Sequence, residues 1–298
     1  MSRIGLVLGA GGVTGDAFHR GVLRAMLDKG YDARDAEIIV GTSAGAMVGA
    51  ALRRPDHPPA VPFVGTVHGR RLGRGPDPTP LLMALARPWR ARAGTLASSL
   101  LPTGRRSTEF LVAQLRRQHA DTWPARDLWI CAVRRHDGRR VVFGRPGSPP
   151  TDVAHAVAAS IAIPGYFHPV EIDGEVYVDG GVHSPTNAAV LRQRGLDLVI
   201  VSSPMSVEPR AMRPTADAAL RLYWHRVLRR EVRALQRRGT DVLVIEPGGD
   251  LVSVMGVNPM RGGRVDEVED GAARRAADAL DEHLATNPQT PLRVVTGA

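Results

Sequence analysis

Short runs of apolar, mostly β-branched residues alternate along this chain with stretches in which apolar positions recur every three to four residues. The short runs are typical of buried strands, and the longer periodic stretches are typical of helices with one apolar face. We expect strands at residues 3–8, 38–40, 128–133, 140–143, 198–202 and 242–245. We expect helices that begin near residue 16 and after residue 43, and further helices at residues 107–119, 151–161, 215–238 and 264–284. Strands that alternate with helices favour an α/β protein with a mostly parallel central sheet.

Two Asp-Gly turns divide the middle of the chain. Asp137-Gly138 lies between two of the predicted strands and favours a hairpin. Asp173-Gly174 separates residues 166–172 from residues 175–179, so Asp179 ends a predicted strand directly before two glycines. A carboxylate at such a place can point into a cleft while the backbone bends sharply, although Asp-Gly-Gly is also an ordinary tight turn.

Two of the predicted helices carry more specific expectations. In the helix at residues 107–119, Thr108 could cap the start, and Phe110, Leu111 and Leu115 are expected to face inward. The helix at residues 215–238 is amphipathic, with one apolar face formed by Leu220, Tyr223, Trp224, Val227, Leu228 and Leu235 and with arginines elsewhere. A basic amphipathic helix could lie on anionic lipid. We favour the more common arrangement, in which such a helix covers a sheet.

Between about residues 53 and 106 the composition shifts to proline, arginine and glycine around short apolar pieces. This shift predicts an insertion rather than part of the core. The pieces at residues 81–85, with nearby Trp89, and at residues 96–101 could form short helices that cap a site as a lid. The alternative is a solvent-facing excursion, which is common for long connections.

The composition allows one sizeable α/β domain and argues against nucleic-acid binding. The chain has 298 residues, of which 43% are apolar, and its only cysteine, Cys131, lies in an apolar run where we expect it to pack in the core. The net charge is +9, but Lys29 is the only lysine among 39 basic residues, a skew that G+C-rich coding bias explains as well as phosphate binding does. Aromatic residues make up 4% of the chain, which is poor for base stacking.

Neither a secretory signal nor a membrane span is expected. Residues 1–3 lead directly into a strand and a glycine loop, without the apolar segment and cleavage site of a signal peptide. No stretch approaches about 18 uninterrupted apolar residues. We therefore expect a cytoplasmic protein.

The strongest candidate for chemistry is Gly41-Thr42-Ser43-Ala44-Gly45, a G-x-S-x-G sequence between a predicted strand and a predicted helix. In a nucleophile elbow both glycines are required, because side chains there would collide with the neighbouring strand and helix. Ser43 would then stand exposed at the carboxyl edge of the sheet. The alternative is a glycine-lined turn in which the serine caps the helix.

A second glycine-rich loop, residues 9–15, follows the first predicted strand. It does not fit a dinucleotide-binding fingerprint, since the third glycine position is occupied by Thr14 and the second strand ends in Val40-Gly41 without an acidic residue. Free backbone N–H groups in such a loop can instead stabilise a developing oxyanion at the same sheet edge as the G-x-S-x-G turn. A plain connection that needs positive φ would use the same glycines.

Taken in order, the glycine loop, the G-x-S-x-G turn and the Asp-Gly-Gly turn resemble the patatin-like phospholipase family of serine lipid hydrolases. Residues 158–164 and 167–169 are also similar to the stretch that precedes the aspartate in that family. The similarity extends over much of residues 4–190. It implies a three-layer sandwich with helices on both faces of the sheet, and a single domain over residues 1–298 with the insertion described above.

The resemblance also implies roles for individual residues. Ser43 matches the nucleophile, Asp179 matches the other half of a catalytic dyad, and Gly11 and Gly12 match the oxyanion loop. The remaining motif glycines are Gly15, Gly41, Gly45, Gly180 and Gly181. The implied activity is that of a phospholipase A or lysophospholipase, without cofactor or metal, acting on lipid or ester substrates with peripheral contact to membranes. Thr14 departs from the family, whose members often carry a basic residue there, and this departure weakens the inference about substrate class.

Two other functions remain open from the sequence. A Ser-Asp-His triad esterase needs a histidine after the acid, and His183, His225 and His283 all follow Asp179. A non-catalytic module that binds lipid or nucleic acid could use the basic helix and the arginine-rich insertion. Loss of activity in histidine variants would favour the triad, and salt-sensitive binding that survives Ser43→Ala would favour the module.

Overall fold

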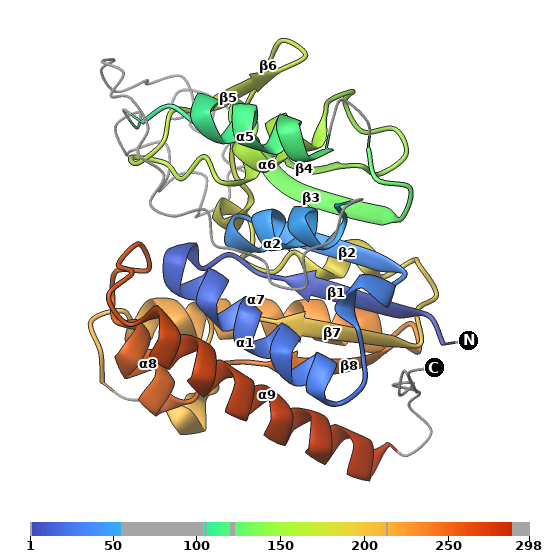
Figure 1. Ribbon diagram of the computed structural model, residues 1–298, viewed down its shortest axis with the longest axis vertical. Helices are drawn as coiled ribbons and strands as arrows, with labels where there is room; N and C mark the ends of the chain where they lie inside the picture. Colours follow the sequence, from blue (N-terminus) through green and yellow to red (C-terminus); the bar gives the residue numbers. More distant parts are fainter. Residues whose placement is uncertain (1, 55–103, 105, 120–122, 213, 288–298) are drawn as a thin grey trace.

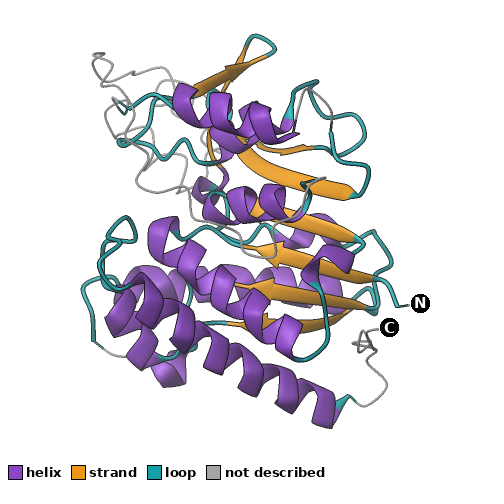
Figure 2. Cartoon of the chain, viewed as in Figure 1, coloured by secondary structure: helices purple, strands orange, loops and turns teal. Residues whose placement is uncertain are grey.

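The computed structural model describes residues 2–54, 104, 106–119, 123–212 and 214–287. The predicted insertion, with its two short helices and the lid hypothesis, lies almost entirely outside the described residues. The described strands form one sheet with helices packed on both of its faces (Figure 1, Figure 2). This arrangement confirms the expected three-layer α/β fold with a mostly parallel sheet.

The sheet has the strand order β5-β6-β3-β2-β1-β7-β8, and β4 pairs with β3. Its parallel part consists of β3 (Asp127–Arg134), β2 (Ile38–Thr42), β1 (Ile4–Leu8), β7 (Leu198–Ser202) and β8 (Asp241–Ile245). The antiparallel part adds β4 (Arg140–Phe143), β5 (Val170–Ile172) and β6 (Glu175–Asp179). Because β1 and β2 are neighbours and parallel, the connections after them emerge at the same sheet edge.

Most helices cover the face of the sheet that is nearer the viewer in Figure 1. These are α1 (Gly12–Asp28), α2 (Ala44–Leu52), α5 (Glu109–His119), α6 (Val153–Ser160), α8 (Gly249–Met255) and α9 (Val265–Thr286). The opposite face is covered by α7 (Ala218–Gln236) and by the short 3₁₀ helix η4 (Ala188–Leu191). Three more 3₁₀ helices lie in connections: η1 (Ala33–Asp35), η3 (Gly180–Val182) and η5 (Pro209–Ala211).

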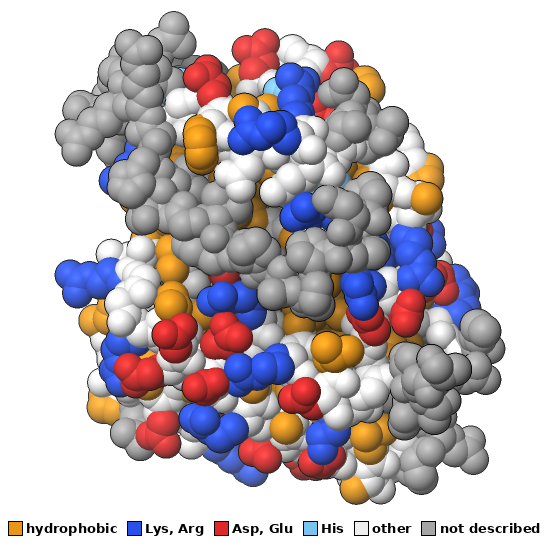
Figure 3. Space-filling model, in the orientation of Figure 1, with side chains coloured by type: hydrophobic (Ala, Val, Ile, Leu, Met, Phe, Trp, Pro, Cys, Tyr) orange, Lys and Arg blue, Asp and Glu red, His pale blue; other side chains and the backbone are white. Residues whose placement is uncertain are grey.

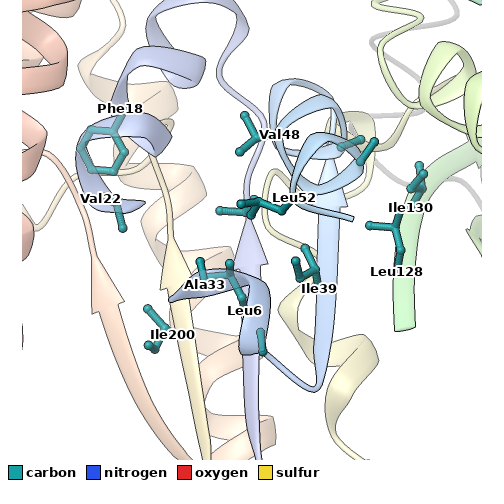
Figure 4. Close-up of a cluster of buried hydrophobic side chains, with 14 of the residues drawn as sticks. Leu6, Phe18, Val22, Ala33, Ile39, Val48, Leu52, Leu128, Ile130 and Ile200 are labelled. Carbon is teal, nitrogen blue, oxygen red and sulfur yellow. The ribbon is translucent and has the colours of Figure 1, made fainter. Parts of the chain in front are cut away.

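Alternation along the strands divides the core into two layers. Leu6 and Ile39 point toward the face covered by α1 and α2 and belong, with Phe18, to the cluster drawn in Figure 4. Val7 and Val40 point to the other face and pack in the cluster that contains the buried residues of α7. Strands that are buried on both faces read as continuous apolar runs, which is why the sequence located them well.

The helix α1 begins earlier than expected, at Gly12 rather than near residue 16. The first turn of the helix is therefore built from the glycine loop itself. Glycine weakens a helical pattern because of its backbone entropy, so the periodicity alone placed the start one turn too late.

Three side chains expected to face inward are exposed. Phe110 is 60% exposed, while Leu111 and Leu115 of the same helix are buried as expected. Leu220 and Tyr223 are 47% and 45% exposed, whereas Leu228 and Leu235 are buried as expected. The buried stripe of α7 also includes Arg221, Glu231 and Val232, which were not expected there. A helix has room for only one such stripe, so neighbouring apolar residues about 100° away are left in solvent.

The expected cap of α5 also differs in detail. Thr108 receives a main-chain hydrogen bond from Val112 at its carbonyl oxygen. The side chain that supports the start of the helix is Ser107, whose Oγ accepts from the Glu109 N–H at 3.1 Å.

Cys131 is fully buried in β3, as expected. Within the described ranges, no helix combines the length and the low polarity that crossing a bilayer would require.

Candidate active site

Ser43 occupies a sharp turn between β2 and α2, with φ 54° and ψ −119°. This region is costly for any residue with a Cβ atom, and such strain is typical of functional sites. A Cβ atom at Gly45 would overlap the carbonyl oxygen of Leu8, and one at Gly41 would lie 2.5 Å from Cα of Ala46. The local structure is therefore a nucleophile elbow in geometry, and its two glycines are required by backbone contacts.

The backbone of the elbow is held by a side chain that sequence reasoning gave no role. The Ser43 N–H donates to Oγ of Ser160 at 2.9 Å, and the Ser160 hydroxyl donates to the carbonyl oxygen of Cys131 at 2.7 Å. Ser160 ends α6, and Cys131 lies in β3 beside the elbow. The only signal in the sequence was that Ser160 belongs to the stretch that resembles the family.

Asp179 lies at the carboxyl end of β6, and its carboxyl group lies beside the side chain of Ser43, whose interaction with it lowers the pKa of the aspartate. Its Oδ1 also accepts from the Gly181 N–H at 2.7 Å. A Cβ atom at Gly180 would overlap the carbonyl oxygen of Cys131, so the turn needs glycine there to lie against β3. The structure thus brings together two residues that are more than a hundred positions apart in the sequence.

The Asp179 carboxyl group is 5% exposed, and burial raises its pKa to about 6. The hydrogen bonds from Ser43 and Gly181 oppose this effect, because they favour the ionised form. A carboxylate with a raised pKa is a stronger base than an ordinary aspartate.

Ser43 lies at the expected sheet edge, but its side chain is 3% exposed rather than open to solvent. The expectation of an exposed serine was wrong, because the turn places Ser43 at the sheet edge but the side chains packed around it cover it. These neighbours include the carboxyl group of Asp179.

The glycine loop is fastened to its surroundings at its first two residues. The Gly9 N–H donates to the Ser202 carbonyl at 3.0 Å, and the Ala10 N–H donates to the Pro185 carbonyl at 2.8 Å. The carbonyl oxygen of Gly9 accepts from the Gly45 N–H at 3.2 Å. This last bond joins the glycine loop directly to the elbow.

Beyond that point the loop offers free donors. Among the described residues, no acceptor is paired with the N–H groups of Gly11 and Gly12. Gly12 has φ 58°, and a Cβ atom there would lie 2.9 Å from the Pro259 carbonyl oxygen. Both the backbone conformation and the lack of space therefore require glycine at this position. Unpaired N–H groups at a helix N-terminus are suited to bind an anion.

Two other loop residues have structural contacts. Thr14, which stands where the family often has a basic residue, donates its N–H to the Pro259 carbonyl and its hydroxyl to the Gly11 carbonyl. Gly15 donates its N–H to the same Gly11 carbonyl at 2.8 Å. These bonds hold the first turn of α1 in place.

His19 is a buried residue of α1 that the sequence analysis missed. Its Nε2 lies 2.7 Å from the carbonyl oxygen of Gly9 and its Nδ1 lies 2.7 Å from Oγ of Ser202. Since a carbonyl only accepts, Nε2 carries the proton and Nδ1 accepts from the serine. Burial lowers the pKa of His19 to about 4, so the ring is neutral and acts as a fixed support of the glycine loop.

The histidines of the triad hypothesis are placed differently. His225 Nδ1 lies 3.1 Å from the carboxylate of Glu246, and His283 Nε2 lies 3.1 Å from the carboxylate of Asp241. His183 ends the turn of η3. The hydrogen bonds that lower the pKa of the Asp179 carboxyl come from Ser43 and Gly181. Across the described ranges, no group of three or more His, Cys, Asp or Glu side chains is placed to hold a metal ion.

Comparison with known proteins identifies the family. The family model described as patatin-like phospholipase matches residues 6–192, which is more than half of the chain. The chain therefore belongs to the patatin-like phospholipase family, as the resemblance implied.

Its similarity to individual proteins is more distant. An uncharacterized NTE family protein of Mycobacterium tuberculosis, Rv1063c, is 31% identical over 201 residues, which cover 67% of this chain and 49% of that protein. Lysophospholipase NTE1 of Coccidioides immitis is 27% identical over 66% of this chain and 11% of its own length. The chain thus spans about half the length of the mycobacterial relative.

Two solved structures are also similar. VipD from Legionella pneumophila matches with a TM-score of 0.44 and 16% identity, over 95% of this chain and 67% of that chain. ExoU from Pseudomonas aeruginosa, in complex with SpcU, matches with a TM-score of 0.39 and 17% identity, over 96% of this chain and 52% of that chain.

Proposed function

We propose that this protein is a serine-dependent lipid acyl hydrolase of the phospholipase A or lysophospholipase type, with Ser43 as nucleophile and Asp179 as base. The observation that carries the proposal is that the buried Asp179 carboxyl group lies beside the side chain of Ser43, which stands on a strained elbow. Membership of the patatin-like phospholipase family supports the reaction class. The similarity to a fungal lysophospholipase supports the substrate class.

In the first half of the proposed reaction, Oγ of Ser43 attacks the acyl carbon while the Asp179 carboxylate takes the hydroxyl proton. The former carbonyl oxygen carries the negative charge and accepts hydrogen bonds from the free N–H groups of the glycine loop. When the intermediate collapses, the alcohol leaves with the proton from Asp179, and the acyl group remains as an ester on Ser43.

In the second half, Asp179 takes a proton from water, and the hydroxide attacks the ester. Collapse releases the fatty acid, and the Ser43 oxygen regains the proton from Asp179. The raised pKa of Asp179 suits both directions of this transfer, because the group can accept a proton near neutral pH and return it.

The N–H groups of Gly11 and Gly12 are the proposed oxyanion donors. They are unpaired among the described residues, and the rest of the loop is fixed by Gly9 and His19. A preorganised donor of this kind typically contributes about 10²–10³ in rate.

We infer further that residues 1–298 form one domain with an insertion at about 53–106. The support is that all described strands belong to a single sheet.

The decisive experiment compares turnover of p-nitrophenyl esters of short and medium chain length by the wild type and two variants, Ser43→Ala and Asp179→Asn. Both variants are expected to lose activity, while His183→Ala keeps it. Labelling by a fluorophosphonate probe is expected for the wild type and not for Ser43→Ala. A wild type that neither turns over nor is labelled, or a Ser43→Ala variant that keeps its rate, would contradict the proposal.

Peripheral membrane contact belongs to the same proposal, since a lipid hydrolase must reach its substrate. Sedimentation with anionic vesicles at low salt is expected to carry the protein into the pellet. Protein that stays in the supernatant would count against membrane contact without touching the esterase result.

A further inference from the structure

Asn187 is a fully buried residue just before η4 that neither the sequence motifs nor the proposed dyad account for. Its backbone adopts φ 53°, a left-handed conformation that asparagine tolerates better than most residues. Its backbone N–H donates to Oγ of Ser184 at 3.1 Å, and its side-chain Nδ2 donates to the Ser184 carbonyl at 2.7 Å. Both the main chain and the side chain of Asn187 are therefore held in one arrangement.

The same amide nitrogen reaches the flanks of both proposed catalytic residues. Nδ2 of Asn187 lies 3.1 Å from Oγ1 of Thr42 and 3.3 Å from the carbonyl oxygen of Gly180. Thr42 directly precedes Ser43, and Gly180 directly follows Asp179. An amide NH₂ group has two hydrogens, so with one on the Ser184 carbonyl the other is shared between Thr42 and Gly180. A single side chain thus contacts both segments that carry the dyad.

The orientation of this amide is fixed by Arg140, a half-buried residue that lies near the buried carboxylate of Glu231. Oδ1 of Asn187 accepts from Nη1 of Arg140 at 3.1 Å, and since a guanidinium only donates, the NH₂ group must face Thr42. The same Nη1 lies 4.0 Å from Oε1 of Glu231, a buried carboxylate of α7. Oε2 of Glu231 accepts from the hydroxyl of Thr186 at 2.6 Å and from the N–H of Ala188 at 2.9 Å.

The sheet explains why such a bridge matters. Ser43 follows β2 and Asp179 ends β6, and these strands are separated in the sheet by β3. Strand pairing therefore sets the separation of the two side chains only indirectly. The amide of Asn187 is a second, shorter connection between the two strand ends.

We propose that Asn187 is a positioning residue for the dyad, which holds the segments of Ser43 and Asp179 at hydrogen-bonding separation and is itself oriented by Arg140 and Glu231. This inference rests on the proposed function. Asn187 does not touch substrate in this scheme, and it acts through the backbone on either side of the reacting groups.

Two variants remove the bridge from opposite ends. Asn187→Gly keeps the left-handed backbone conformation and removes the amide, and Thr42→Val removes the hydroxyl acceptor at nearly constant shape. Each is expected to lower kcat on a p-nitrophenyl ester by about 10–100-fold with little change in KM, because a small misplacement of reacting groups costs up to about 10²-fold. A kcat within about twofold of the wild type in both variants would overturn the proposal.

The double variant, Asn187→Gly with Thr42→Val, distinguishes the loss of one shared hydrogen bond from a general disturbance of the structure. If both residues act through the same hydrogen bond, the double variant loses about as much kcat as the more impaired single variant. Losses that multiply would overturn the bridge. His283→Leu is the matched control, because it removes the contact of a buried histidine with the partly exposed Asp241 at the first residue of β8, away from the dyad. It is expected to lower Tm and to leave kcat unchanged.

A readout that needs no turnover is the ionisation of Asp179, followed by ¹³C NMR of its carboxyl group with Asp179→Asn as the assignment control. The hydrogen bond from Ser43 lowers the pKa of Asp179, so a looser dyad in Thr42→Val is expected to raise that pKa above the wild-type value. An unchanged pKa would overturn the positioning role. If the wild type proved inactive, the proposed function would fail, and this titration would still decide whether Asn187 positions the pair.

Discussion

At the scale of single residues, the site is built from groups held in states that cost stability. Ser43 has a backbone conformation that residues with a Cβ atom avoid, and Asp179 is a carboxyl group removed from water. Both costs are expected where function opposes stability. Removing the cost should therefore stabilise the protein and abolish its activity.

Asp179→Asn is expected to raise stability at neutral pH. The pKa of this carboxyl is raised from 3.8 to about 6, so the folded state binds its proton more tightly than the unfolded state does. The cost is absent below 3.8, grows as pH rises, and is complete above about 6, where it amounts to about 3 kcal/mol. Thermal unfolding of the variant and the wild type from pH 5 to 8 is expected to show a Tm difference that widens from pH 5 through the pKa of about 6 and is constant above it. A difference of the opposite sign would contradict this account.

The pH dependence of catalysis follows from the same group. If Asp179 takes the proton of Ser43, kcat/KM falls tenfold per pH unit below a pKa of about 6 and levels off above it. The profile should be measured on a p-nitrophenyl ester from pH 4.5 to 8, with enzyme stability checked at each pH. A rate that stays constant down to pH 5 would mean that the base is a different group or that its pKa is not raised.

At the scale of elements, the site depends on how closely α2 packs against β1. Gly45 lies so near the main chain of Leu8 that a side chain cannot fit, and its N–H is bonded to the Gly9 carbonyl. The elbow and the glycine loop are therefore parts of one packed unit. A change in this contact should affect both.

Gly45→Ala is expected to destabilise the protein by several kcal/mol, because the backbone of β1 cannot move aside as a side chain can. Gly49→Ala, one turn later in α2, is the control: its nearest neighbours are side-chain atoms of Ile39 and Leu128 at 3.0 and 3.3 Å. Urea unfolding of both variants compares them. Equal stability of the two would contradict the packing argument.

At the scale of the whole molecule, the first and the last described α-helices pack against each other and so join the two ends of the described chain. α1 and α9 pack side by side across the near face (Figure 1), and a Cβ atom at Gly21 would overlap the Glu269 carbonyl oxygen. Ion pairs line the same contact, including Arg20 with Glu269 at 3.2 Å. Figure 3 shows acidic and basic side chains interspersed over this face.

Gly21→Ala is expected to force the two helices apart and to lower stability by about 2 kcal/mol or more, through lost packing rather than lost charge. Arg24→Ala, which removes an exposed pair with Asp270, is expected to change stability by less than about 1 kcal/mol. Denaturant unfolding of both tests the order. A larger effect of the arginine variant would show that the ion pairs hold the contact.

Much of this architecture could be predicted from local patterns. Apolar runs located the parallel strands, the Asp-Gly turns located the hairpins, and the fold class and the family were correct. The ends of elements were less well predicted: glycines hid the first turn of α1, and apolar residues such as Phe110 and Leu220 were assigned to a core that had no room for them. Periodicity reports that a helix has an apolar face, and the packing partner decides which residues occupy it.

The sequence by itself determined the features that depend on only a few neighbouring residues. These are the glycines required by the elbow, the strand that ends at Asp179, and the order of the motifs. Only the tertiary structure decided which distant groups meet. The approach of Asp179 to Ser43, the support of the elbow by Ser160, and the contact of Asn187 with Thr42 each join segments far apart in the chain. Such contacts, and the burial that raises the pKa of Asp179, depend on the packing of the whole sheet, and no local pattern encodes that packing.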